Sequence, residues 1–269
     1  MSIEGRYIDF ATARTYVREV GEGEATLVLI HGAEADSSMW EPYMEGLARG
    51  RRVLAVDLPG HGGTDAPEDL DASAKGIADW FSSMLRTEGL DTVDLLGHSM
   101  GGTVALHIAL ETPDLVRRLV LVDTGGLCWP SSSIGKGVEE FLRILVEGEL
   151  DEEKVRSMVA RIYGWEPGSE AVLESARFWV RPGVRRFFSN GGLVFTRPLP
   201  IWRLRGLAPP TFLIWGKRDR WFPLSTAKEE MIYIPGFKLL VIEEGTHSPF
   251  VEAPDTFYLG VDAFLSDES

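Results

Sequence analysis

The sequence predicts an α/β protein: a mostly parallel, doubly wound sheet with a helical lid inserted between two late strands. Short apolar runs alternate with helix-like stretches, which is typical of a parallel sheet covered by helices on both faces. Residues 128–209 interrupt this alternation, and a strand–turn–helix pattern surrounds Ser99 in VDLLGHSMGGTVAL. The length of 269 residues is near the upper limit for one hydrophobic core, so one domain with an insertion is expected.

The expected elements follow the chain in order. The continuous apolar run TLVLI at residues 26–30 is typical of a strand covered on both faces. We expect strands at 6–10 and 14–20 (a hairpin), 26–30, 53–56, 93–96, 119–122, 211–215 and 239–242. We expect helices at 38–48, at 73–88, directly after Ser99 and at 254–265.

Residues 128–209 show no strong strand pattern. They contain three helix-like stretches, at 136–147, 151–163 and 169–180. So long a segment is not an ordinary loop of a compact domain, so we predict a small helical lid. The core domain is then formed by residues 1–127 and 210–269. A lid at 128–209 would lie at the sheet edge where parallel sheets bind ligands.

The charge balance restricts the partners. Lys and Arg number 27 against 41 Asp and Glu, a net charge of −14 that repels nucleic acid and anionic membrane surfaces. No apolar run has the length of a membrane span, and the N-terminus shows no secretory signal. The single Cys128 cannot form an intrachain disulfide. These features predict a cytoplasmic protein without a nucleic acid or membrane partner.

Ser99 is the candidate nucleophile. The sequence GHSMG fits G-x-S-x-G, with a predicted strand before it and a predicted helix after it. A serine that presents its hydroxyl at such a turn must adopt strained backbone angles, and flanking glycines remove Cβ atoms that would collide. A serine that merely caps a helix needs neither glycine, so the pattern favours a nucleophile over a cap.

A serine hydroxyl needs a base to remove its proton, and His247 is the candidate. It follows the apolar run LLVIEEG and precedes Pro249, so a loop beyond the last strand can bring its imidazole over Ser99. The other four histidines are interpreted as residues that pack or fix loops. They lie in glycine-containing loops, beside Ser99 or on the next helix: His31, His61, His98 and His107.

The base needs a carboxylate to orient it. Asp219 follows the strand pattern TFLIW within WGKRD, and Asp123 at the end of LVLVD is the competitor. We favour Asp219, which gives the chain order Ser, Asp, His of one fold class. Two backbone N–H groups complete the site as oxyanion donors: Ala33, in the loop after TLVLI, and Met100, at the start of the helix.

The lid is expected to set the substrate. Seven arginines and no acidic residue lie between Arg177 and Arg205, interleaved with aromatic residues. Either these arginines pair with the acidic body, or one or two of them hold a substrate carboxylate. The candidate substrate-binding residues are Arg177, Trp179, Arg181 and Phe187 in the lid and Trp221 in the acid loop.

Five motifs in order resemble those of the α/β-hydrolase fold superfamily, in its serine-nucleophile branch. They are the oxyanion loop HGAEADSSMW, the segment VDLPGHGGTDAP, the elbow GHSMGG, the acid loop WGKRDRWFP and the histidine loop GTHSPFVEAPDTF. The resemblance covers nearly all of the chain outside the lid. It implies the triad Ser99, Asp219 and His247, with oxyanion donors at Ala33 and Met100.

The resemblance implies a serine hydrolase that cleaves a small carboxylic ester or lactone through an acyl-enzyme, without a metal or organic cofactor. The elbow and acid loop are also similar to those of C–C bond hydrolases that act on ring-cleavage dienoates. Those enzymes usually have a glycine-rich oxyanion loop, where this chain has Ala33, Glu34 and Ala35. Two further alternatives are a small-ligand receptor with slow turnover and a perhydrolase.

Overall fold

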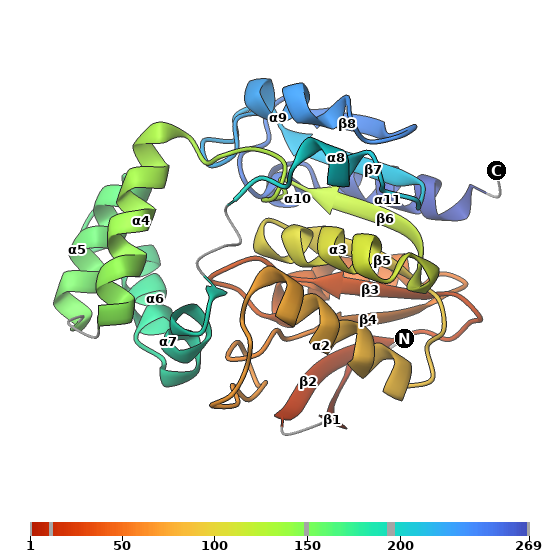
Figure 1. Cartoon of the computed structure of the whole chain (residues 1–269), viewed down its shortest axis with the longest axis horizontal. Helices are drawn as coiled ribbons and strands as arrows, with labels where there is room; N and C mark the ends of the chain where they lie inside the picture. Colours follow the sequence, from red (N-terminus) through yellow and green to blue (C-terminus); the bar gives the residue numbers. More distant parts are fainter. Residues whose placement is uncertain (1, 11–12, 148–150, 193–196, 268–269) are drawn as a thin grey trace.

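A computed structural model describes residues 2–10, 13–147, 151–192 and 197–267. An eight-stranded sheet runs through it in the order β1-β2-β4-β3-β5-β6-β7-β8 (Figure 1). The β1–β2 and β2–β4 pairs are antiparallel and all other pairs are parallel. The predicted fold class, a mostly parallel sheet of the α/β-hydrolase type, is therefore confirmed.

The strands lie close to their predicted positions. They are β1 (Glu4–Phe10), β2 (Ala13–Val20), β3 (Thr26–Ile30), β4 (Arg52–Val56), β5 (Val93–His98), β6 (Val116–Val122), β7 (Thr211–Gly216) and β8 (Lys238–Ile242). The helices are α1 (Glu41–Leu47), α2 (Ala74–Thr87), α3 (Met100–Glu111), α4 (Ser132–Glu147), α5 (Glu152–Tyr163), α6 (Glu170–Trp179), α7 (Pro182–Ser189), α8 (Ile201–Leu204), α9 (Leu224–Met231), α10 (Pro249–Glu252) and α11 (Pro254–Ser266).

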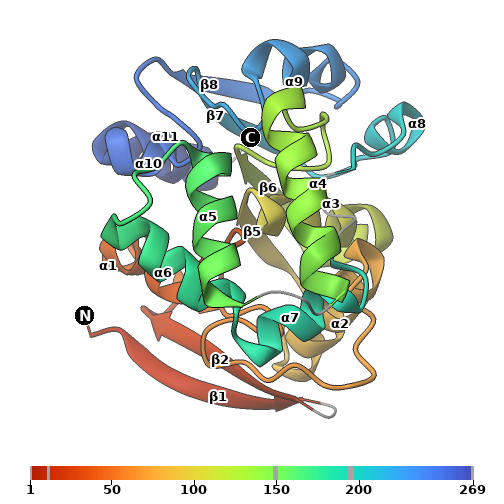
Figure 2. The ribbon, with the colours of Figure 1, turned by 90° about the vertical axis from the view of Figure 1, so that its left-hand side faces the viewer.

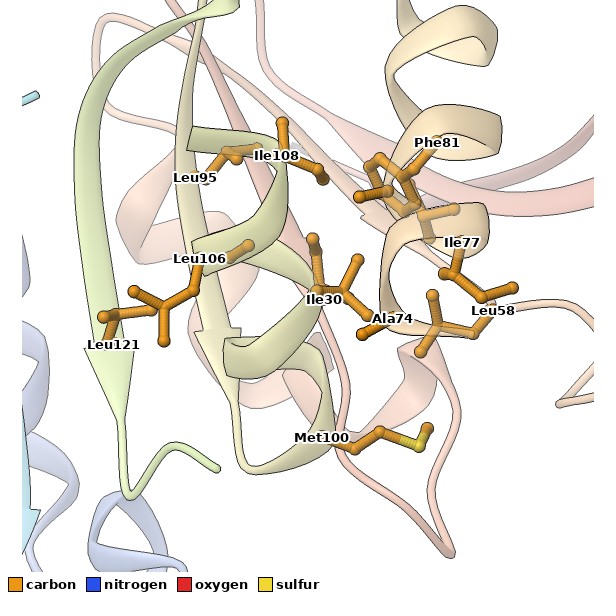
Figure 3. Packing of buried hydrophobic residues seen from close by; sticks show 14 of the residues in the cluster. Ile30, Leu58, Ala74, Ile77, Phe81, Leu95, Met100, Leu106, Ile108 and Leu121 are labelled. Carbon is orange, nitrogen blue, oxygen red and sulfur yellow. The ribbon is translucent and has the colours of Figure 1, made fainter. Parts of the chain in front are cut away.

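The sheet is covered on both faces, as the apolar run at 26–30 predicts. Val28 and Ile30 of β3 pack into the cluster that includes α2 and α3, whereas Leu27 and Leu29 pack with α1 and α11. Alternate side chains of a strand point to opposite faces, so a strand buried on both faces is apolar throughout. Figure 3 shows the first of these layers, where Ile77 and Phe81 of α2 approach α3.

Several local features differ from the predicted elements, among them the short helices α8 and α10, which were not expected. The expected helix at 38–48 is a 3-10 turn, Ser37–Trp40, followed by α1, which has a proline in its first turn. Helix α7 was not expected; it begins at Pro182, and proline at the first helical position is favourable because that N–H has no intrahelical partner. Helix α9, between β7 and β8, was also not expected.

Helices α4 to α8 lie between β6 and β7, which are neighbours in the sheet. Figures 1 and 2 show α4, α5, α6 and α7 grouped together beyond one end of the strands. Aromatic contacts join them: the ring of Trp179 on α6 lies 4.9 Å from that of Phe141 on α4 and 5.0 Å from that of Phe188 on α7. We refer to α4–α7 as the helical insertion. Within the described residues, no helix combines the length and apolar character needed to cross a membrane.

Candidate active site

Ser99 lies on the turn between β5 and α3 in a strained conformation, with φ 52° and ψ −116°. Two glycines make this turn sterically possible. A Cβ on Gly97 would lie 2.4 Å from the carbonyl oxygen of Gly101, and a Cβ on Gly101 would lie 2.4 Å from that of His31. The flanking glycines are therefore required by close backbone approach, as the sequence pattern indicates.

Hydrogen bonds hold the backbone of Ser99 in this conformation. Its N–H donates to the carbonyl of Val122 on β6 at 3.0 Å. Its carbonyl accepts from the N–H groups of Gly102, Thr103 and Gly125, at 3.0, 3.2 and 3.1 Å. Backbone strain persists only where the surroundings enforce it, and here β6 and α3 do so.

The structure brings Ser99, His247 and Asp219 into one hydrogen-bonded chain. The Ser99 hydroxyl lies 2.9 Å from Nε2 of His247, and Nδ1–H of His247 donates to Oδ2 of Asp219 at 3.0 Å. The other carboxylate oxygen, Oδ1, accepts from the N–H groups of Trp221 and Phe222, at 2.7 and 3.2 Å. These bonds fix the acid, and the acid fixes the imidazole with its Nε2 towards Ser99.

Asp123, the competing acid, has a different place. It is buried at the end of β6 with φ 39°, and its Oδ1 accepts from the N–H of Gly216 on β7 at 2.9 Å. Burial, with the nearby negative charge of Asp219, raises the pKa of Asp123 well above its ordinary value. Asp123 therefore joins two strands beneath the site and makes no hydrogen bond to His247 among the described contacts.

His98 has a role in the site that the sequence did not reveal. Its Nε2–H donates to the carbonyl oxygen of His247 at 2.7 Å. Burial lowers the pKa of His98 to about 3, so the ring is neutral at pH 7. In the sequence, the position of His98 next to Ser99 was the one signal for this role. Its partner His247 is 149 positions away along the chain, too far for a local sequence pattern to indicate the contact.

His31 and His61 fix loops, as predicted. Nδ1–H of His31 donates to the carbonyl of Gly32 at 2.7 Å, and Nε2 accepts from the N–H of Leu58 at 2.9 Å. His61 donates from Nδ1 to the carbonyl of Pro59 at 3.0 Å, and burial lowers its pKa to about 3. His31 thus ties the loop after β3 to the loop after β4.

The N–H groups of Ala33 and Met100 are available for an oxyanion. Both residues line the same cavity as Ser99, and neither N–H donates a hydrogen bond to any group in the described part of the chain. Met100 begins α3, where the first N–H groups have no intrahelical acceptor. A negative charge that develops beside Ser99 would therefore meet free donors and the positive end of a helix dipole.

Two cavities meet at Ser99. The apolar pocket lies under the helical insertion, and Glu34 is the single charged side chain among its described lining residues. The polar cleft is more open and contains His247, Arg218 and Arg220. The residues shared by both are Ala33, Glu34, Ser99, Ile162, Tyr163 and Trp221; the apolar pocket adds Met100, Val138, Phe141, Leu142, Val159, Trp179, Phe188, Gly192 and Phe222.

The predicted substrate-binding residues divide into two groups. Trp179 lines the apolar pocket, and Trp221 lines both cavities with its ring stacked 5.7 Å from that of His247. Phe187 is fully buried behind the pocket wall, with its ring 5.1 Å from that of His61.

The two predicted arginines, Arg177 and Arg181, line neither of the two cavities at Ser99. Arg177 is exposed, and its guanidinium lies 3.5 Å from the carboxylate of Glu170, about two turns earlier on the same helix. Arg181 is exposed, with its guanidinium 5.8 Å from the centroid of the Phe178 ring. On α6 the helical period directs Phe178 and Trp179 inward and Arg177 to solvent, whereas Arg181 lies in the exposed connection before α7.

Glu34 was not predicted as a site residue. It lies directly after Ala33, lines both cavities and accepts hydrogen bonds from three side chains of the helical insertion. In the sequence, the signal was a charged residue at a place where C–C bond hydrolases usually have glycines. In the described ranges, no cluster of three His, Cys, Asp or Glu side chains is arranged to hold a metal ion.

Comparisons with known proteins agree with this fold. A model of the alpha/beta hydrolase family matches residues 27–258. The chain belongs to the alpha/beta hydrolase family, and the resemblance seen in the sequence is confirmed.

Curated relatives include both esterases and C–C bond hydrolases. A pimeloyl-[acyl-carrier protein] methyl ester esterase of Nitrosomonas europaea is 28% identical over 93% of this chain and 99% of its own. A 2-hydroxymuconate semialdehyde hydrolase of Pseudomonas sp. (strain CF600) is 27% identical over 98% of this chain and 94% of its own. Among solved structures, carboxylesterase CesB of Bacillus subtilis superimposes with a TM-score of 0.81 at 20% identity, over 99% of this chain and 92% of that one, which shows the shared fold.

Proposed function

We propose that this alpha/beta hydrolase is a serine hydrolase that cleaves a small carboxylic ester or lactone through an acyl-enzyme. The observation that carries the proposal is the hydrogen-bonded chain from Ser99 through His247 to Asp219, at 2.9 and 3.0 Å. In this mechanism His247 removes the hydroxyl proton, and Ser99 Oγ attacks the carbonyl carbon. His247 then gives the proton to the leaving alcohol, and activates water to release the acid.

The N–H groups of Ala33 and Met100 would hold the oxyanion of each tetrahedral intermediate. Removal of one such donor typically lowers kcat by about 100- to 1,000-fold. Both donors are backbone groups, so the side chains matter through the position they give to the backbone. The free N–H of each residue beside Ser99 supports this role.

The apolar pocket supports an uncharged acyl group. Its wall is aliphatic and aromatic, from residues such as Val138, Leu142 and Ile162, and its single charged side chain in the described ranges is Glu34. A free carboxylate in this pocket would lose its hydration without gaining a cation, which is unfavourable. Alcohol groups would leave through the polar cleft, which is the more open of the two cavities.

A C–C bond hydrolase is the alternative, because relatives such as the 2-hydroxymuconate semialdehyde hydrolase share the fold at 27% identity. Dienoate substrates carry a carboxylate. In the polar cleft Arg218 and Arg220 are the cations that could meet one. The apolar pocket offers no cation among its described lining residues, so an ester with an uncharged acyl group is the better-supported substrate.

The first experiment is hydrolysis of p-nitrophenyl butyrate by the wild type, Ser99→Ala and the control Ser83→Ala. Ser83 is an exposed serine on α2, so its loss should leave turnover unchanged. We expect turnover that disappears in Ser99→Ala alone. Equal rates in all three proteins would contradict the proposal. Release of a single equivalent would indicate a receptor, and activity that requires peroxide would indicate a perhydrolase.

Acyl selectivity is tested with p-nitrophenyl hemisuccinate, which keeps the leaving group and adds a carboxylate to the acyl chain. We expect a kcat/KM at least tenfold below that for the butyrate, because the pocket wall offers no cation. A preference for the hemisuccinate, or cleavage of a dienoate with no ester hydrolysis, would favour the C–C hydrolase alternative.

A further inference from the structure

The side chain of Glu34 connects the helical insertion to the loop that follows β3. Its Oε1 accepts from the hydroxyl of Tyr163 on α5 at 2.6 Å and from Nε1–H of Trp179 on α6. Its Oε2 accepts from the hydroxyl of Ser175 on α6 at 2.7 Å. Three donors from two helices of the insertion therefore converge on one carboxylate of the core.

The backbone of Glu34 is left-handed, with φ 57°. A residue with a Cβ is unfavourable there, and glycine would avoid the strain. No hydrogen bond of the Glu34 N–H or carbonyl to another part of the described backbone compensates for it. What glutamate adds over glycine is the set of side-chain hydrogen bonds to the insertion.

The loop of Glu34 is packed directly against the nucleophile turn. A Cβ on Gly32 would lie 2.8 Å from Nδ1 of His98 and 3.1 Å from Cβ of Ser99. Ala33, which lines the cavity beside Ser99, lies between this packed glycine and Glu34. The position of Ala33 is therefore set on one side by Gly32 and on the other by Glu34.

Glu34 is partly buried and forms no ion pair with the described residues, so these three hydrogen bonds are the described contacts that stabilise its carboxylate. Burial raises the pKa of this carboxyl above its ordinary value, while the three hydrogen bonds oppose the shift. If the insertion moved away, the carboxylate would regain water, and the buried hydroxyl and indole donors would lose their acceptor.

A second contact runs from the same tyrosine to the base. The ring of Tyr163 lies 5.2 Å from that of Trp221, and Trp221 is stacked 5.7 Å from His247. Docking of Tyr163 on Glu34 therefore orders the aromatic wall beside His247 as well as the loop that carries Ala33.

We propose that Glu34 is a positioning residue that couples docking of the helical insertion to the geometry of the oxyanion donor Ala33. The inference rests on the proposed hydrolase function, because Ala33 is an oxyanion donor only in that mechanism. With the insertion docked, Glu34 is held by α5 and α6, and the N–H of Ala33 points into the cavity. With Glu34 released, the loop relaxes and the transition state loses a donor.

The test compares Glu34→Ala and Glu34→Gln with the wild type on p-nitrophenyl butyrate. The control Glu140→Gln removes the exposed contact of Arg161 on α5 with Glu140 on α4, which does not reach Glu34. We expect kcat to fall by about 10- to 100-fold in Glu34→Ala, with KM changed less than threefold, since loss of an oxyanion donor acts on the transition state. Glu34→Gln should lie between, because its amide keeps one acceptor oxygen. Glu140→Gln should match the wild type.

Affinity for a trifluoromethyl ketone, which forms an oxyanion on Ser99, separates positioning from stability. We expect this affinity to fall in parallel with kcat, whereas affinity for the butyrate product stays the same. Unchanged kcat and unchanged ketone affinity in both Glu34 variants, whatever their melting temperature, would overturn the proposal.

If Glu34→Ala does not fold, Tyr163→Phe and Ser175→Ala remove one donor each and should lower kcat by smaller factors. Amide hydrogen exchange of residues 31–36 gives a readout that needs no turnover. We expect faster exchange there in Glu34→Gln and Tyr163→Phe than in Glu140→Gln, and equal exchange would contradict coupling. If the wild type shows no ester hydrolysis that depends on Ser99, the proposed function is refuted. The hydrogen-exchange measurement would still decide whether Glu34 couples the helical insertion to residues 31–36.

Discussion

The Nε2–H of His98 donates a hydrogen bond of 2.7 Å to the carbonyl oxygen of His247. The residue before Ser99 thereby holds the backbone of the residue whose imidazole faces Ser99. The two rings are also close, with centroids 5.1 Å apart. The end of β5 therefore contacts both the turn that carries Ser99 and the loop that carries His247.

Replacement of His98 by phenylalanine removes this donor and keeps an aromatic ring against Phe250, whose ring lies 5.1 Å away. A neutral hydrogen bond contributes about 0.5–1.5 kcal/mol, so we expect kcat for an ester to fall by about tenfold or less. Steady-state kinetics measure this effect. An unchanged kcat in a folded His98→Phe protein would show that the bond does not orient His247.

Replacement of Asp219 by asparagine is expected to lower kcat far more than the same replacement of Asp123. Asp219→Asn removes the carboxylate that orients His247, and we expect kcat to fall by about 10⁴-fold. Asp123→Asn keeps an oxygen for the N–H of Gly216 and leaves the bond to His247 in place, so we expect kcat within about threefold of wild type. Kinetics of the two variants side by side decide between the acids. A larger loss in Asp123→Asn would contradict the assignment.

The strained turn makes a prediction about stability. Ser99 has φ 52°, a backbone conformation that glycine adopts without strain and alanine does not. We expect Ser99→Gly to have a higher free energy of unfolding than Ser99→Ala, by about 1–3 kcal/mol. Urea unfolding of both inactive variants measures the difference. Equal midpoints and slopes would mean that the turn stores no strain at Ser99.

Buried neutral histidines should weaken the fold in acid. Burial lowers the pKa of His61 to about 3, whereas an unfolded histidine titrates near about 6.5. Below the unfolded value the unfolded chain binds a proton that the native state does not, so stability falls as pH decreases from about 6.5 towards 3. Each such histidine contributes a slope of about 1.4 kcal/mol per pH unit.

The variant His61→Phe tests this slope, since the ring lies among Phe178, Phe187 and Phe188. Urea unfolding at pH 7, 6 and 5 should show a pH dependence smaller by about 1.4 kcal/mol per unit at the acid end than in the wild type. Identical slopes would contradict a neutral buried His61, even if the variant were less stable throughout.

The exposed arginines give the last prediction. Arg177→Ala and Arg181→Ala should each leave kcat/KM within about twofold of wild type for both p-nitrophenyl butyrate and the hemisuccinate, because neither side chain lines the cavities at Ser99. The same kinetic comparison on the two substrates measures this. A selective loss on the anionic substrate would restore the carboxylate-binding role that the sequence suggested.

Local patterns in the sequence predicted most of the fold. The apolar run at 26–30 matches β3 to the residue, because a strand buried on both faces must be continuously apolar. Helices α7 and α9, of eight residues each, are too short to give a periodic signal of their own. Their formation depends on packing of Phe187, Phe188 and Met231 against the rest of the protein.

By itself, the sequence determined the strained serine turn, because glycines at 97 and 101 and an apolar strand are local requirements of that backbone. It also pointed to His247 and Asp219, which the structure places in a hydrogen-bonded chain with Ser99. Only the tertiary structure decided that His98 holds His247, that Glu34 receives three donors from the insertion, and that Arg177 and Arg181 face solvent. Those relationships join residues distant in the chain, and their partners are set by how helices pack on the sheet, which no local spacing encodes.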